Sequence, residues 1–197
     1  MNKQVVLDLL QNYQTSFNEE IEFQKQIIDF LTQNDDFALR SNLIGQLTGS
    51  AWIVNKERTK VLLIHHKKLN KWLQIGGHIE DTDQNIEETI LREIEEESGI
   101  SNLKLLSLGS NLIYDIDIHT IPQKNEIAKH LHFDIRLLVE ADENEKLIPQ
   151  NEEILAIKWY SLNEIEKLTE SNPSVKRMID KMNLGQTHEI IFQFSPH

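Results

Sequence analysis

Cysteine is absent from the sequence, which excludes disulfide bonds and thiolate chemistry. No apolar run approaches the roughly 20 residues that a membrane-spanning helix needs. The first residues are polar and lack the long apolar stretch and small-residue cleavage site of a secretory signal. These absences predict a cytoplasmic protein without a membrane partner.

Basic residues are scarce, since 20 Lys and Arg stand against 32 Asp and Glu and give a formal net charge of −12. Proteins that bind duplex nucleic acid normally present a basic face, so this balance argues against a nucleic-acid partner. An acidic protein can still bind phosphate groups when metal ions lie between the two sets of negative charge. The 197 residues suffice for one large domain, or for one domain with an extension.

Glycine and proline are both missing before Gly45, and apolar residues in this part recur near the helical period. Residues 1–47 are therefore predicted to be helical, with a third, short helix over 37–47. We expect a helical extension over 1–47 and a single domain over 48–197. The extension is expected to serve in packing or in forming a homodimer.

Beyond residue 48 the pattern changes to short runs of β-forming residues between polar turns. A helix is predicted over 85–98, with Asp83 as its N-cap and Gly99 as its C-terminal stop. Two short helices are predicted over 162–169 and 174–182. This order indicates an α+β fold with a mixed sheet flanked by helices. The predicted strands cover 50–54, 60–65, 103–108, 113–118, 132–140, 154–160 and 190–194.

The helix over 85–98 carries a crowd of carboxylates. Glu93, Glu96 and Glu97 share one side because they are spaced i, i+3 and i+4, and they border an apolar stripe that includes Ile90 and Ile94. Half-buried carboxylates repel one another and lose hydration, so they are costly unless a positive charge joins them. Their hard oxygen ligands suit Mg²⁺ or Mn²⁺ better than zinc. The alternative is a solvated, charged helix face.

Residues 92–100, REIEEESGI, match the second half of the Nudix box, R-E-apolar-x-E-E-x-G-apolar, at every specified position. Residues 76–80, GGHIE, resemble the Gly-Gly-x-x-Glu lead-in of the same family. The loop between the two parts is one residue longer than the family pattern, which leaves its acidic position open between Glu80, Asp81 and Asp83. The chain thus resembles the Nudix (MutT-like) hydrolases, and the resemblance implies a Nudix fold with a mixed β-sheet between helical layers.

The resemblance also implies an activity, which is metal-dependent hydrolysis of a phosphoanhydride bond in a small nucleotide-like substrate such as a nucleoside diphosphate derivative. It makes Glu93, Glu96, Glu97 and the Gly77 carbonyl the metal ligands, for Mg²⁺ or Mn²⁺. Arg92 would orient a neighbouring glutamate, and Glu93 is the first candidate to take the proton from water. Some family members use a glutamate from a distant loop instead, for which the candidates are Glu140, Glu143, Glu152 and Glu153. The alternative function is a non-catalytic ligand-binding module.

A second constellation contains His119, His130 and His132, followed by Asp134. Side chains two residues apart in a strand point to one face, so His130, His132 and Asp134 are candidates to line a substrate cleft. His78, beside the glycine turn, is a candidate phosphate contact. A zinc site built from the three imidazoles of the second constellation is an alternative, and hydrogen-bonded histidines at a sheet edge are another.

Overall fold

The computed structural model describes residues 1–123, 128–149, 153–168, 172–184 and 187–189. The helices are α1 (Lys3–Asn12), α2 (Asn18–Gln33), α3 (Ile86–Ser98), α4 (Leu162–Leu168) and α5 (Pro173–Leu184). The strands are β1 (Gly45–Val54), β2 (Lys60–His66), β3 (Lys71–Leu73), β4 (Ile75–His78), β5 (Leu103–Leu108), β6 (Ile113–Ile121), β7 (His130–Ala141), β8 (Ile154–Ser161) and β9 (Thr187–Glu189).

The strands form one mixed sheet with the order β3-β2-β1-β7-β5-β9. Long parallel pairing joins β1 to β7, whereas β4 pairs antiparallel with β1, β6 with β7 and β8 with β2. The β1–β4 register sets Gly49 opposite Gly77 and Ser50 opposite Gly76. The glycine turn is therefore attached to the central strand of the sheet.

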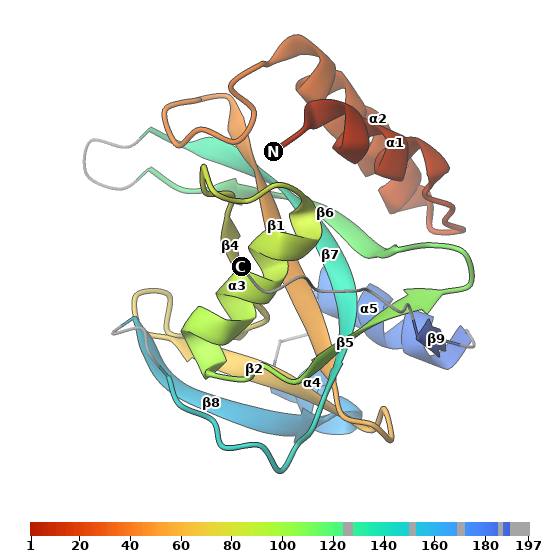
Figure 1. Cartoon of the computed structure of the whole chain (residues 1–197), viewed down its shortest axis with the longest axis vertical. Helices are drawn as coiled ribbons and strands as arrows, with labels where there is room; N and C mark the ends of the chain where they lie inside the picture. The colour runs from red at the N-terminus through yellow and green to blue at the C-terminus, as the bar shows by residue number, and fades with distance from the viewer. Residues whose placement is uncertain (124–127, 150–152, 169–171, 185–186, 190–197) are drawn as a thin grey trace.

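Alternation along the strands divides the core between the two faces of the sheet. On β1, Ala51 and Ile53 pack with α1, α2 and α3, while Trp52 and Val54 pack with α4 and α5. Figure 1 shows α3 crossing in front of the sheet and α5 behind it. The expected α+β fold, with a mixed sheet between helical layers, is confirmed.

The N-terminal helices pack directly on the sheet. Leu10, Ile27 and Leu31 have no exposed surface, and the ring of Phe30 stacks on Phe133 of β7 with centroids 4.1 Å apart. Figure 1 shows α1 and α2 together beside β6 and β7. The packing role expected for these helices is thus observed, and dimer formation stays a prediction.

Two of the expected local features are wrong. The third helix over 37–47 does not form, because residues from Gly45 onward pair with β7 instead. Asp83 is not the N-cap of α3, since the Asn85 side chain accepts the hydrogen bond from the Glu88 backbone. Gly99 ends the helix as predicted, with a left-handed φ of 75°. The strand expected over 190–194 lies outside the described residues, and within them no helix is both long and apolar enough to cross a membrane.

Candidate active site

Helix α3 places the glutamates beside the glycine turn. Its buried stripe contains Ile86, Ile90 and Ile94, which are at most 1% exposed and hold the helix against the sheet. Glu93 and Glu97 follow at the edge of that stripe, with Glu97 8% exposed. The helical spacing read from the sequence therefore produces the predicted half-buried carboxylates.

Burial makes the charged form of these carboxylates costly. Loss of solvent, followed by the repulsion from Glu93, raises the pKa of Glu97 to about 8. Burial likewise raises the pKa of Glu93, although the Arg92 guanidinium opposes this shift. Glu96 is the exposed member, with 57% of its side chain accessible. The site thus carries more negative charge than its surroundings neutralise.

Arg92 ties the glycine turn to the helix. Its Nη1 donates to Glu93 at 2.9 Å and to Glu96 at 3.2 Å, and its Nη2 donates to the His78 carbonyl at 2.9 Å. Nε and Nη2 also bind the Asp83 carboxylate at 3.1 and 3.0 Å. The orienting contacts expected of Arg92 are therefore present.

Asp83 is the one of the three alternatives for the acidic position that contacts Arg92. Of the three alternatives, Glu80 pairs with Arg40 at the surface, and Asp81 is exposed. Burial alone would raise the pKa of Asp83, but its bonds to Arg92 and to the Glu80 backbone hold that pKa below its usual value. The extra loop residue thus leaves an aspartate in contact with the arginine of the box.

The residues at the turn fit a hard cation. A Cβ at Gly77 would lie 2.5 Å from the Glu93 Oε1 atom, so only glycine lets this carboxylate approach the turn. Glu97 Oε2 is buried and, among the described residues, has no hydrogen-bond partner. As they stand, no three His, Cys, Asp or Glu side chains of the described residues are arranged to hold a metal ion. Arg92 supplies positive charge to Glu93 and Glu96.

A cleft of about 710 Å³ opens at this point. Its lining includes Gly77, Glu93 and Glu97 together with residues of β6, β7 and the start of α5. Of the predicted substrate contacts, His78, His119, His132 and Asp134 line it. His130 does not, but its ring lies 5.4 Å from that of His132.

Three imidazoles, those of His78, His119 and His130, lie around His132. Its ring centroid lies 4.9 Å from that of His78 and 5.4 Å from that of His119. Burial lowers the pKa of His132 to about 3 and that of His78 to about 4, so both rings are neutral at pH 7. The His78 Nε2 atom hydrogen-bonds the Gln46 side chain at 2.9 Å. His78 and His132 thus offer neutral, aromatic and hydrogen-bonding surface to the cleft.

The glutamates that the sequence offers as alternative bases lie in different places. Glu153 lines the cleft, whereas Glu140 and Glu143 border a different hollow and pair with Lys104 and Lys60. The fourth candidate, Glu152, lies outside the described residues.

One group of charged side chains was not anticipated as a unit. Arg136 of β7 is 4% exposed and donates to Asp134, Asp115 and Asp117 at 2.8, 3.0 and 3.1 Å. Arg177 and Lys181 of α5 bind Asp115 from the other side. The sequence held one signal for this group, because Arg177 and Lys181, two of the three basic residues of α5, are spaced i, i+4 on the side of the helix that contains the apolar Met178.

Solved structures of other proteins share this fold and carry hydrolase names. A hydrolase of the NUDIX family from Clostridium perfringens is 28% identical, with a TM-score of 0.50, over 70% of this chain and 96% of that chain. The NUDIX hydrolase from Nitrosomonas europaea is 22% identical, with a TM-score of 0.51, over 76% and 96% of the two chains. The E. coli dihydroneopterin triphosphate pyrophosphohydrolase is 16% identical, with a TM-score of 0.51, over 68% and 92%. The class defined by fold and site is that of the Nudix-type hydrolases.

The family follows from the sequence. A family profile described as the NUDIX domain matches residues 46–182, while no curated protein matches the chain significantly. The chain belongs to the Nudix family and is a pyrophosphohydrolase by class.

Proposed function

We propose that the protein hydrolyses a phosphoanhydride bond of a nucleoside diphosphate derivative or related small molecule, with Mg²⁺ or Mn²⁺ as cofactor. The observation that carries this proposal is the pair of half-buried carboxylates of Glu93 and Glu97 beside the glycine turn. A side chain at Gly77 would collide with the Glu93 carboxylate, so the glycine is what lets this carboxylate lie against the turn. Glu93, Glu96, Glu97 and the Gly77 carbonyl would hold the metal. A divalent ion at such a site neutralises the pyrophosphate and lowers the pKa of a bound water.

The chain's own residues supply the remaining parts. Arg92 orients Glu93 and Glu96 through its bonds of 2.9 and 3.2 Å. A Glu93 carboxylate oxygen is proposed to accept the proton of the attacking water, and Glu153 is the alternative base because it lines the same cleft. His78, His119 and His132, with His130 behind them in the cluster and Asp134 beside them, are proposed to contact the substrate.

The test is release of phosphate or mononucleotide from a panel that contains ADP-ribose, ATP, a dinucleotide polyphosphate and a nucleotide sugar, with and without Mg²⁺ or Mn²⁺. Metal-dependent turnover of any member supports the proposal. Glu96→Gln should then remove most of the turnover and leave the melting temperature unchanged, because this side chain is exposed and its role is to bind the ion. Glu95→Gln, at an exposed neighbouring position, is the matched control.

Full turnover in Glu96→Gln would contradict the ligand assignment. Metal binding without turnover of any panel member would favour the alternative, a non-catalytic ligand-binding module.

A further inference from the structure

A continuous line of buried charges joins the N-terminal helices to the cleft. It runs through Glu20 of α2, Lys181 of α5, Asp115 of β6, and Arg136 and Asp134 of β7, and we call these five residues the buried ion-pair chain. Each of the five is at most 4% exposed. Unpaired charges are very costly in such surroundings, so each member is held in place by its neighbours.

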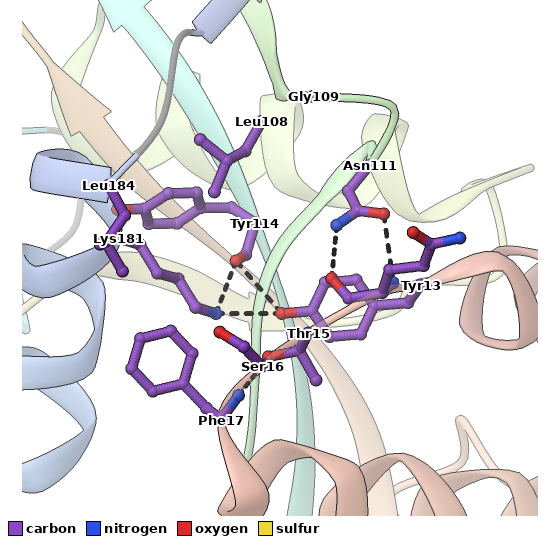
Figure 2. A pocket seen from close by; sticks show the side chains of 11 residues that line it. Tyr13, Thr15, Ser16, Phe17, Leu108, Gly109, Asn111, Tyr114, Lys181 and Leu184 are labelled. Atoms are coloured by element: carbon purple, nitrogen blue, oxygen red, sulfur yellow. Dashed lines mark hydrogen bonds between the residues drawn. The ribbon is translucent and has the colours of Figure 1, made fainter.

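The end of the buried ion-pair chain that contains Glu20 and Lys181 lies under the N-terminal segment. Lys181 Nζ donates to Glu20 at 2.6 Å, to the Tyr114 carbonyl at 2.8 Å and to the Tyr13 hydroxyl at 3.0 Å. Lys181 lines a cavity of about 400 Å³, and Figure 2 shows its ammonium group among the side chains of Tyr13, Phe17 and Tyr114. These rings lie 5.4–5.7 Å from Nζ. The lysine is therefore fixed by the extension and does not reach out of the cavity for a ligand.

Asp115 forms the middle of the buried ion-pair chain. Its Oδ1 accepts from Lys181 at 2.7 Å and from Arg177 at 2.8 Å. Its Oδ2 accepts from Arg136 at 3.0 Å and from Arg177 at 3.0 Å. With no exposed surface, this carboxylate cannot exchange one of these cations for water.

The other end of the buried ion-pair chain, at Asp134, reaches the glycine turn. Arg136 Nε donates to Asp134, whose other donors are the hydroxyls of Thr48 and Ser50 on β1, at 2.9 and 2.7 Å. Ser50 lies opposite Gly76 in the β1–β4 ladder, and a Cβ on Gly76 would collide with the Ser50 side chain.

The glycine turn also lies beside Glu93 and Glu97. The backbone of Gly76 lies close enough to the Glu97 carboxylate to oppose the rise of its pKa, and the Glu93 carboxylate lies against Gly77. The contacts are therefore unbroken from α2 to the proposed metal ligands.

We propose that Glu20 and Lys181 are positioning residues for the hydrolytic site, which makes the N-terminal helices part of the catalytic unit. The inference rests on the proposed function, because it gives these residues the task of holding the turn against Glu93 and Glu97. Removing Glu20 leaves Asp115 as the remaining carboxylate partner of Lys181, and removing Lys181 leaves Glu20 with Arg177 at 3.8 Å. The remaining charge then pulls on or repels Asp115, and the displacement passes through Arg136 to β1 and the turn.

The test compares Glu20→Gln, Lys181→Met and the double variant in the full chain. In the double variant Asp115 keeps Arg136 and Arg177, so the turn should recover its native position. Lys176→Met is the control, because Lys176 belongs to the same helix but pairs with Asp180 at the surface.

The first readout is independent of metal and of catalysis. Selective ¹⁵N labelling of glycine gives seven backbone signals. The signals of Gly76 and Gly77 should shift in both single variants, stay in place in Lys176→Met, and return toward their native positions in the double variant. Gly99, at the far end of α3, should not move in any of them.

The second readout is Mn²⁺ affinity from water-proton relaxation, measured well below the melting temperature. The single variants should bind Mn²⁺ about tenfold more weakly, which is the scale of losing an outer-shell partner. Folded single variants with native Gly76 and Gly77 signals and native Mn²⁺ affinity would overturn the proposal, even if their melting temperatures fall. Should Lys181→Met not fold, Glu20→Gln decides by the same criteria, because an amide has the shape of a carboxylate.

Failure of the proposed function would look different. A wild-type protein that binds no Mn²⁺ and turns over no member of the substrate panel refutes that function. The glycine signals would then decide alone whether the buried ion-pair chain positions the turn.

Discussion

Asp83→Asn should destabilise the fold by about 2 kcal/mol. The Asp83 carboxylate is 4% exposed and accepts four hydrogen bonds, two from Arg92 and one each from the Glu80 backbone and the Thr89 hydroxyl. An asparagine keeps the shape but turns an amide nitrogen toward these donors. Hydrogen bonds to charged groups contribute roughly 1.5–3 kcal/mol. The loss stays below the roughly 3–5 kcal/mol of a fully broken buried pair, because Arg92 retains Glu93 and Glu96.

The assay is urea unfolding of Asp83→Asn beside Glu80→Gln and Asp81→Asn. The Glu80–Arg40 pair is 52% and 68% exposed, so its loss should cost less than about 1 kcal/mol, and Asp81 is exposed as well. In a chain of this size about 2 kcal/mol corresponds to a drop in melting temperature of about 4–8 °C. Equal losses in the three variants would refute the reasoning that Asp83 alone fills the acidic position of the box.

Three further perturbations test the rest of the account. Gly77→Ala should lower kcat by about 100-fold with little change in melting temperature, because the new Cβ displaces the flexible end of Glu93; steady-state kinetics beside thermal melts would check this. The contribution of His78 and His132 to stability should fall as pH drops from about 6.5 toward 4, because the unfolded chain binds protons that these buried rings refuse, their folded pKa values being about 4 and about 3; the raised pKa of Glu97, about 8, acts in the opposite direction over this range. His132→Gln should flatten that slope in melts taken at several pH values. A chain starting at Gly45 should show no cooperative melt, because it lacks the buried side chains of α1 and α2 that pack on the sheet and deprives Lys181 of Glu20; a sharp melt and a stable monomer on size exclusion would contradict this.

The elements that could be read from the sequence are those whose signals are local. Helix α3 was predicted to within one residue because its apolar stripe, its carboxylates and Gly99 all lie within one short segment. The segment over 37–47 failed for the opposite reason. Its apolar spacing suits a helix, but β1 from Gly45 onward finds its backbone partners in β7, which is distant in sequence. Competition of this kind explains the N-cap as well, because Arg92 occupies the Asp83 carboxylate and leaves Asn85 to cap the helix.

The residues of the candidate site also fall into two groups, those that local spacing brings together and those that only the fold brings together. The glutamates and Arg92 come from one helix, so their spacing alone brought them together. Arg136, Asp115 and Lys181 come from three elements, and only the folded sheet makes them neighbours. An ion pair between segments that are distant in sequence produces no periodic pattern in the sequence. The one local signal is the presence of Arg177 and Lys181 among the buried residues of α5.

The distribution of cations in the cleft bears on the proposed chemistry. Among the described residues that line it, the Lys and Arg side chains are those of Arg40 and Arg136. The Arg136 guanidinium is engaged by three aspartates, and Arg40 lies at the exposed rim beside Glu80. A pyrophosphate entering the cleft would therefore face Glu93 and Glu97 without a free buried cation to balance its charge. Water-excluded negative charges repel one another strongly, so this arrangement supports the proposed divalent cation, which would supply the positive charge that the cleft lacks.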